Sequence, residues 1–242
     1  MRGRNLQLAH PARLLWRLVA LPCAALLWLA CSTQAGTVLQ FAQVNAADTV
    51  TATESDGVTT LSTAGNPATD GGPSSIAVTL TNFNGAPAPP IAVFETFIGV
   101  TSTGSATMSG GQIAQLFSGT IEFTVSPGPA SSSNPDFLTA TFTNAVFLGT
   151  TNSASLTVSA PDLTLSSSMA TFGTVTGMAI GFSGINSTPL GITDGSVASF
   201  TAQNSGTFSA AAVPEPSTLC LASFATAIGA LAYGRKKMRN VA

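Results

Sequence analysis

The acidic side chains are the residues of this sequence whose types could do chemistry. Glu54, Glu95 and Glu122 are the candidates for a pair of carboxyl groups, which is what hydrolysis of a glycosidic bond requires. Such a pair normally works beside basic and aromatic groups that hold the sugar and tune the acid. Residues 36–213 contain no His, Lys, Arg, Cys, Tyr or Trp. We therefore expect these three carboxylates to be solvated surface groups, and a carboxylate-only polysaccharide hydrolase is the weaker alternative.

The same missing residue types exclude other sites from residues 36–213. Catalysis by Ser-His-Asp or Cys-His needs a histidine base, zinc sites need His or Cys, and phosphoryl transfer needs cationic clamps. Calcium instead takes loop oxygens, and the acidic candidates are Asp48, Glu54, Asp56, Asp70 and Asp194. No Asp-x-Asp-x-Asp pattern joins them, so we assign no metal ligands. We expect no catalytic residue and no cofactor; a calcium-stabilised adhesin or binding module is a further alternative.

Positive charge is confined to the two ends of the chain. All eight Lys and Arg residues precede residue 18 or follow residue 234, whereas all ten carboxylates lie between them. A middle segment without cations cannot neutralise phosphates, so we expect no nucleic-acid partner. The asymmetry instead indicates ends that face a membrane and a middle that is exported.

The N-terminal segment has the order of a secretory signal peptide. Residues 1–17 are basic, residues 18–30 are apolar, and Thr33-Gln34-Ala35 places small residues before a cut after Ala35. The apolar run is short for a membrane span and contains Pro22. We therefore predict a signal peptide over residues 1–35, with an uncleaved anchor or a lipoprotein cut before Cys31 as alternatives.

The C-terminal segment combines a motif, an apolar span and a basic end. Pro214-Glu215-Pro216 precedes the uncharged residues 217–234, which as a helix would measure about 27 Å, close to the thickness of a bilayer core. Four basic residues follow and predict a cytoplasmic end: Arg235, Lys236, Lys237 and Arg239. The two prolines favour an extended, accessible peptide at the membrane face, as a processing enzyme requires.

Residues 214–242 resemble the PEP-CTERM sorting signal of Gram-negative bacteria. The resemblance rests on Val-Pro-Glu-Pro-Ser-Thr at 213–218, the apolar span and the terminal Arg-Lys-Lys, paired with a signal peptide. It implies Sec-type export, a transient inner-membrane intermediate, recognition by an exosortase and release to the cell surface or extracellular matrix. It further implies an organism that makes exopolysaccharide. The alternative is an ordinary tail anchor in which Pro-Glu-Pro is coincidental.

Residues 36–213 carry the pattern of an all-β domain. Ile76, Val78 and Leu80 alternate with small or polar residues, and period two with Thr on the opposite face is typical of half-buried antiparallel strands. Gly- and Pro-rich turn signals separate ten strand candidates: 37–44, 49–53, 58–62, 75–82, 91–100, 113–125 (broken near Gly119), 137–148, 154–165, 171–182 and 196–209.

Many short strands with such turns predict an antiparallel β-sandwich or jelly roll, flanked by a signal helix and a transmembrane helix. We expect 91–100 to be a central strand in which Glu95 and Thr96 face an edge, a ligand or solvent. Together these features predict a non-catalytic exported protein of the cell surface or matrix, associated with exopolysaccharide or biofilm.

Overall fold

The computed structural model describes residues 35–65, 74–84, 91–186 and 190–211. Within these ranges the chain forms thirteen strands and no helix, and every pairing between strands is antiparallel. The predicted all-β antiparallel body is therefore confirmed. The predicted signal helix and transmembrane helix fall in residues 1–34 and 212–242, outside the described residues.

The strands follow the expected segments closely. They are β1 (Ala35–Gln43), β2 (Thr49–Ser55), β3 (Val58–Ala64), β4 (Ile76–Phe83), β5 (Val93–Ser109), β6 (Gln112–Thr124), β7 (Asp136–Gly149), β8 (Ser153–Ser159), β9 (Leu163–Ser166), β10 (Val175–Ser183), β11 (Ile192–Thr193), β12 (Ser196–Val197) and β13 (Phe200–Ala211).

Several strands differ from their predicted extent. The predicted strand 154–165 is divided into β8 and β9, the predicted strand 196–209 is divided into β12 and β13, and β11 lies in no predicted segment. β6 runs unbroken through Gly119, where its register shifts against both β5 and β7. β5 continues past Val100 to Ser109, because it forms a hairpin with β6 around Gly110 and Gly111. Both glycines have positive φ, as a two-residue hairpin turn that matches the strand twist requires.

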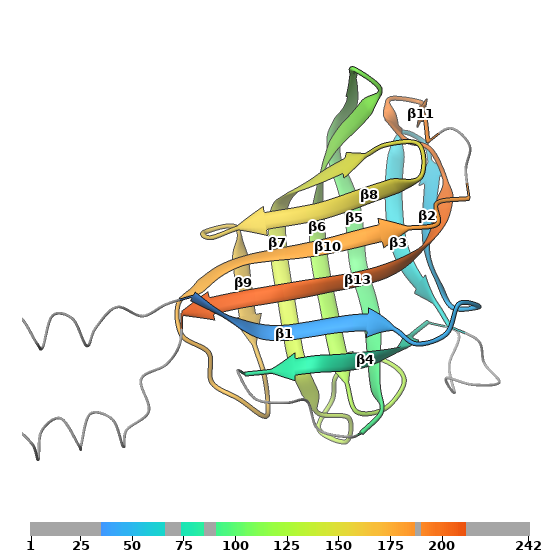
Figure 1. The fold of residues 1–242 in the computed structure, drawn as a ribbon. Helices are drawn as coiled ribbons and strands as arrows, with labels where there is room; N and C mark the ends of the chain where they lie inside the picture. Colours follow the sequence, from blue (N-terminus) through green and yellow to red (C-terminus); the bar gives the residue numbers. More distant parts are fainter. Residues whose placement is uncertain (1–34, 66–73, 85–90, 187–189, 212–242) are drawn as a thin grey trace, which may run out of the picture. The chain divides into compact units, whose positions relative to one another are not determined.

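The strands of the main sheet close into a ring in chain order. It has eight positions, three of which are shared by two strands: β1 and β2, β3 and β4, and β8 and β9. The other five are held by β5, β6, β7, β10 and β13, and β13 pairs back with β1 and β2 to close the ring (Figure 1). Neighbours in the ring are therefore neighbours in sequence, except at the closure between the first and last strands.

Three positions of the ring are held by interrupted strands. β1 and β2 both pair with β13, each with a different part of it, and residues 44–48 interrupt the strand between them. β4 and β3 likewise share β5, and β9 and β8 share β7. The interruptions after β1 and after β3 lie in adjacent strands, because β1 pairs with β4 and β2 pairs with β3.

The strands lie in two layers. In Figure 1, β8, β10, β13, β1 and β4 cross in front of β5, β6 and β7 at a steep angle. Such orthogonal packing lets bends and bulges carry strands from one layer to the other. Register shifts occur in the pairings of β5 with β6 and of β6 with β7.

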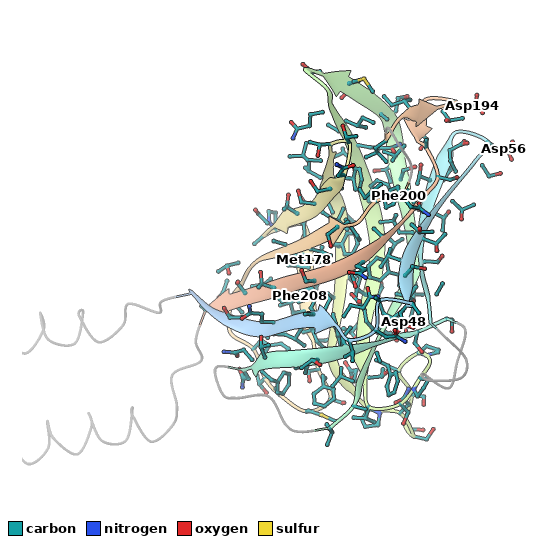
Figure 2. The ribbon with its side chains drawn as sticks, turned by 45° about the vertical axis from the view of Figure 1, so that its right-hand side comes forward. Asp48, Asp56, Met178, Asp194, Phe200 and Phe208 are labelled. Carbon is teal, nitrogen blue, oxygen red and sulfur yellow. The ribbon has the colours of Figure 1, made fainter. Side chains whose placement is uncertain are left out.

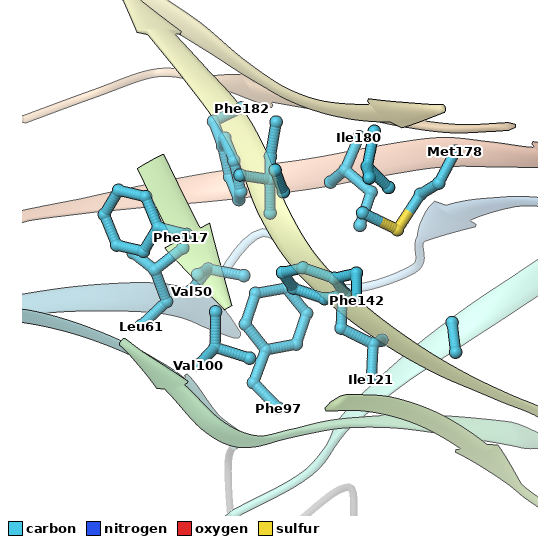
Figure 3. Packing of buried hydrophobic residues seen from close by; sticks show 14 of the residues in the cluster. Val50, Leu61, Phe97, Val100, Phe117, Ile121, Phe142, Met178, Ile180 and Phe182 are labelled. Carbon is cyan, nitrogen blue, oxygen red and sulfur yellow. The ribbon is translucent and has the colours of Figure 1, made fainter. Parts of the chain in front are cut away.

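Phenylalanine fills the space between the layers. The Phe123 ring lies 4.8 Å from Phe41 and 5.5 Å from Phe208, measured between centroids, and Phe147 contacts Phe117, Phe182 and Phe200. Figure 3 shows Phe117, Phe142 and Phe182 among the buried aliphatic residues of this core. Each buried side chain of this size contributes about 1.5–3 kcal/mol, so the apolar interior is the main source of stability.

The expectation that Glu95 and Thr96 could face solvent is wrong. Glu95 is 0% exposed and Thr96 is 4% exposed. Period two explains the buried carboxyl: Glu95 shares the inner face of β5 with Val93 and Phe97, which are also buried.

Candidate functional site

The predicted sorting residues lie outside the described part of the chain, and only the predicted cleavage residue is in it. Pro214, Glu215, Pro216, Arg235, Lys236, Lys237 and Arg239 all follow residue 211, the last that the structure describes. Ala35 is the first residue of β1, and it pairs with Ala211, the last residue of β13. The two ends of the ring thus meet in one strand pair, next to the predicted boundaries of the body.

The three glutamates considered for hydrolysis are not brought together. Glu54 is the last but one residue of β2, and its Oε1 accepts a 3.0 Å hydrogen bond from the backbone N–H of Gly57. Glu122 pairs with Thr96, whereas Glu95 pairs with Phe123, so Glu95 and Glu122 point to opposite faces of the sheet. Glu122 accepts a 2.7 Å bond from the N–H of Ala130. The expectation of surface solvation fails for Glu95 alone.

The acids considered for calcium divide between two regions. Asp56 and Asp194 lie at one end of the ring (Figure 2). The backbones of their loops are close together there, because a Cβ added to Gly57, the residue after Asp56, would lie 3.0 Å from the Asp194 carbonyl oxygen. Asp48 is fully buried elsewhere, at the end of the interruption between β1 and β2. Asp70 lies outside the described residues. In the part of the chain that is described, no three acidic, His or Cys side chains are grouped to hold a metal.

Glu95 makes its polar contact across the interior of the ring. Asn204 Nδ2 on β13 donates a 2.7 Å hydrogen bond to Glu95 Oε2 on β5. Burial raises the pKa of the Glu95 carboxyl to about 8, and the bond from Asn204 lowers it only in part. Glu95 Oε1 and Asn204 Oδ1 have no hydrogen-bond partner among the described residues. With a pKa of about 8, the protonated, uncharged form of Glu95 predominates at neutral pH.

Side chains near this pair replace the ladder bonds that the interruptions remove. The N–H of Asn204 donates to Gln43 Oε1 at 3.1 Å, where β13 passes from β1 to β2. The N–H of Phe97 donates to Thr63 Oγ1 at 3.2 Å, where β5 passes from β4 to β3. We call Gln43, Thr63, Glu95 and Asn204 the seam cluster.

A second polar cluster joins the β11–β12 hairpin to the ring. Gln115 Nε2 donates 2.9 Å bonds to Ser196 Oγ and to the Gly104 carbonyl, while Gln115 Oε1 accepts from the N–H of Val197 at 2.9 Å. The hydroxyls of Ser196 and Thr59 lie 2.7 Å apart. Each of these side chains is uncharged, and no general base stands beside the hydroxyls. The arrangement is that of a buried structural network.

The outer face of β8, β10 and β13 carries ordered hydroxyl groups. Gly177, Ala179 and Gly181 form the central row, and each is flanked on both sides by Ser or Thr: Ser159 and Ser209, Thr157 and Thr207, Ser155 and Ser205. A hollow of about 310 Å3 lies over part of this face, beside Thr157, Gly177 and Thr207. The three strands contain no charged residue, so the hollow offers hydrogen bonds without charge.

The comparisons with known proteins found no relative. No family model, no curated protein and no solved structure matches the chain. Among the described residues, no helix is long and apolar enough to cross a membrane.

Proposed function

We propose that this chain is a non-catalytic exported protein of the cell surface or extracellular matrix, delivered through a PEP-CTERM and exosortase system. In this proposal residues 1–35 are the signal peptide. Residues 36–213 form the exported all-β domain, and residues 214–242 are the sorting tail with its membrane helix. An inner-membrane intermediate precedes release in a Gram-negative bacterium, where the partners are Sec-type machinery, the exosortase and exopolysaccharide.

The observation that carries the proposal is the agreement between the sequence boundaries and the ends of the ring. Signal cleavage after Ala35 removes nothing that follows the first residue of β1, and Pro214 comes after the end of β13. Processing at both places would remove Ala35 from β1 and leave the other described strand residues in place. The pairing of Gly36 with Ala210 supports export of the body as one unit, because the first and last strands of the ring remain joined after both cuts.

The composition of the body supports a structural role. Residues 36–213 lack His, Cys, Lys and Arg, so the sequence supplies no histidine base for its many hydroxyls and no cation, and the three glutamates lie apart. An uncharged, hydroxyl-rich outer face is suited to a hydrated matrix, where many weak hydrogen bonds replace a specific pocket. Purified protein that released sugar from the producer's exopolysaccharide would contradict this role.

The sorting proposal is tested by changing the motif in the producing bacterium. We expect the wild-type chain to appear outside the cell, with an intact mass that lacks residues 1–35 and a C-terminal segment. The variant with Pro214→Ala, Glu215→Ala and Pro216→Ala should remain in the inner-membrane fraction at a larger mass. Pro129→Ala, an exposed proline of the body, is the matched control. Normal processing and release of the triple variant would refute the sorting proposal.

A further inference from the structure

The seam cluster places one ionisable group where two neighbouring pairings of the ring are interrupted. On its β1 and β2 side, β13 lacks a ladder partner between Ala202, paired with Val50, and Ser205, paired with Ala42, although β10 pairs with it on the other side. On its β4 and β3 side, β5 lacks a ladder partner between Glu95, paired with Ile76, and Val100, paired with Leu61. The side-chain bond from Asn204 to Glu95 connects these two strands directly across the interior.

Among the residues that the structure describes, none brings a positive charge near Glu95. It pairs with Ile76 on β4 and with Phe123 on β6, both fully buried, and its polar neighbour on β13 is Asn204. Gln43 of β1 is uncharged. Asp48, before β2, is the other buried acid among the described residues, and Glu122 on β6 faces the opposite side of the sheet. A charged Glu95 would therefore be buried without a counterion, which is strongly unfavourable.

We propose that Glu95 acts as a pH-dependent latch between β5 and β13. When Glu95 is protonated, its contact with Asn204 holds the two strands together beside their interruptions. When Glu95 is deprotonated, the strands separate around the seam cluster and water enters; we call this the open seam. The proton passes to solvent, and the carboxylate gains the hydration that the closed seam denies it. The opening is confined to the seam cluster and the strand ends beside it, because the pairing of β6 with β7, which runs from Ile113 to Thr124, does not depend on this contact.

The equilibrium between closed and open seam then depends on pH in a defined way. An open seam exposes Glu95 to water, where its pKa is near 4.5, whereas burial in the closed seam raises the pKa to about 8. Between these values the open form is deprotonated and the closed form is not. One proton is released per opening, so the opening constant should rise about tenfold per pH unit and level off above pH 8.

Hydrogen exchange of the full-length chain, followed by mass spectrometry at pH 5, 6, 7 and 8, tests the latch. Exchange of each peptide in the wild type is divided by exchange of the same peptide in Glu95→Gln at the same pH, which cancels the intrinsic effect of pH on exchange. Gln keeps an oxygen for Asn204 and cannot ionise. Glu122→Gln, on the outer face of the neighbouring strand, is the matched control.

We expect the ratio to rise about tenfold per pH unit for peptides that cover residues 43–48, 93–97 and 202–205. The ratio for peptides of β6 and β7 should also rise with pH, because global unfolding exposes Glu95 as well, but these peptides should remain more protected than the seam peptides at every pH. A ratio that is independent of pH at the seam would overturn the proposal. Equal protection of the seam and of β6 and β7 at every pH would also overturn it, because the seam would then open only by global unfolding. If Glu95→Gln fails to fold, the rise of wild-type seam exchange with pH and its excess over β6–β7 exchange, each corrected for intrinsic exchange, decide between the same outcomes.

Discussion

The ring of Phe41 lies against the backbone of Gly206. The two residues are paired across β1 and β13, and a Cβ added to Gly206 would stand 2.8 Å from Phe41 Cε1 and 2.8 Å from the Ala179 carbonyl oxygen. Ile180, the partner of Gly206 on β10, covers the site from the other side at 3.1 Å. A glycine on the inner face of β13 thus makes room for the aromatic core.

We predict that Gly206→Ala destabilises the fold by about 1–3 kcal/mol, because the added methyl group overpacks a filled core and meets a backbone oxygen. Gly181→Ala is the matched control, since that glycine faces outward on β10 and its nearest atom to an added Cβ is 3.9 Å away. Gly181→Ala should leave the free energy of unfolding unchanged or raise it by about 0.4–1 kcal/mol, because alanine restricts the unfolded chain more than glycine does. Urea unfolding of both variants measures the difference, and equal stabilities would contradict the packing described.

Removing the amide of Gln115 should destabilise the β11–β12 attachment. Gln115→Ala leaves the Val197 N–H and the Gly104 carbonyl without the partners they have in the structure. Each buried unsatisfied group costs about 1–3 kcal/mol, so we expect a loss of roughly 2–4 kcal/mol in urea unfolding. Hydrogen exchange should also accelerate in residues 192–197. Gln112→Ala, at the exposed start of the same strand, should have neither effect.

The alternation of apolar and polar residues was sufficient to predict the class of the fold. In β4, Ile76, Val78 and Leu80 are buried, as period two requires. The same rule could have revealed the buried acid, because Val93, Glu95 and Phe97 occupy one face of the strand. Apolar residues on both faces of the segment concealed that signal, because Phe94 and Ile98 made the opposite face as compatible with burial as the face of Val93 and Phe97.

The closure of the ring was beyond what the sequence could predict. Alternation fixes which face of a strand is buried, but it does not select the partner strand. The pairing of β1 with β13 joins residues from opposite ends of the body, and no local pattern encodes it. The contact of Asn204 with Glu95 depends on that closure, so this part of the candidate site could be found only from the three-dimensional structure. The sorting residues rest on the sequence motif alone.

The stability of the whole protein should fall as pH rises from 5 to 8. The pKa of Glu95 is raised from 4.5 to about 8 on folding, so the folded state retains a proton that the unfolded chain has lost between these values. The loss amounts to roughly 3 kcal/mol over this range, and stability should level off above pH 8. Below pH 4.5 both states hold the proton and Glu95 contributes no pH dependence.

Glu95→Gln isolates this contribution. The variant should match the wild type at pH 5 and exceed it by roughly 3 kcal/mol at pH 8, because the neutral amide pays no cost of losing a proton in the core. Urea unfolding at the two pH values measures the difference. Glu122→Gln should follow the wild-type profile, since that carboxylate lies on the outer face of the sheet. A wild-type stability that rose between pH 5 and pH 8 while Glu95→Gln stayed level would show that Glu95 is charged in the fold, with a cation supplied from outside the described residues.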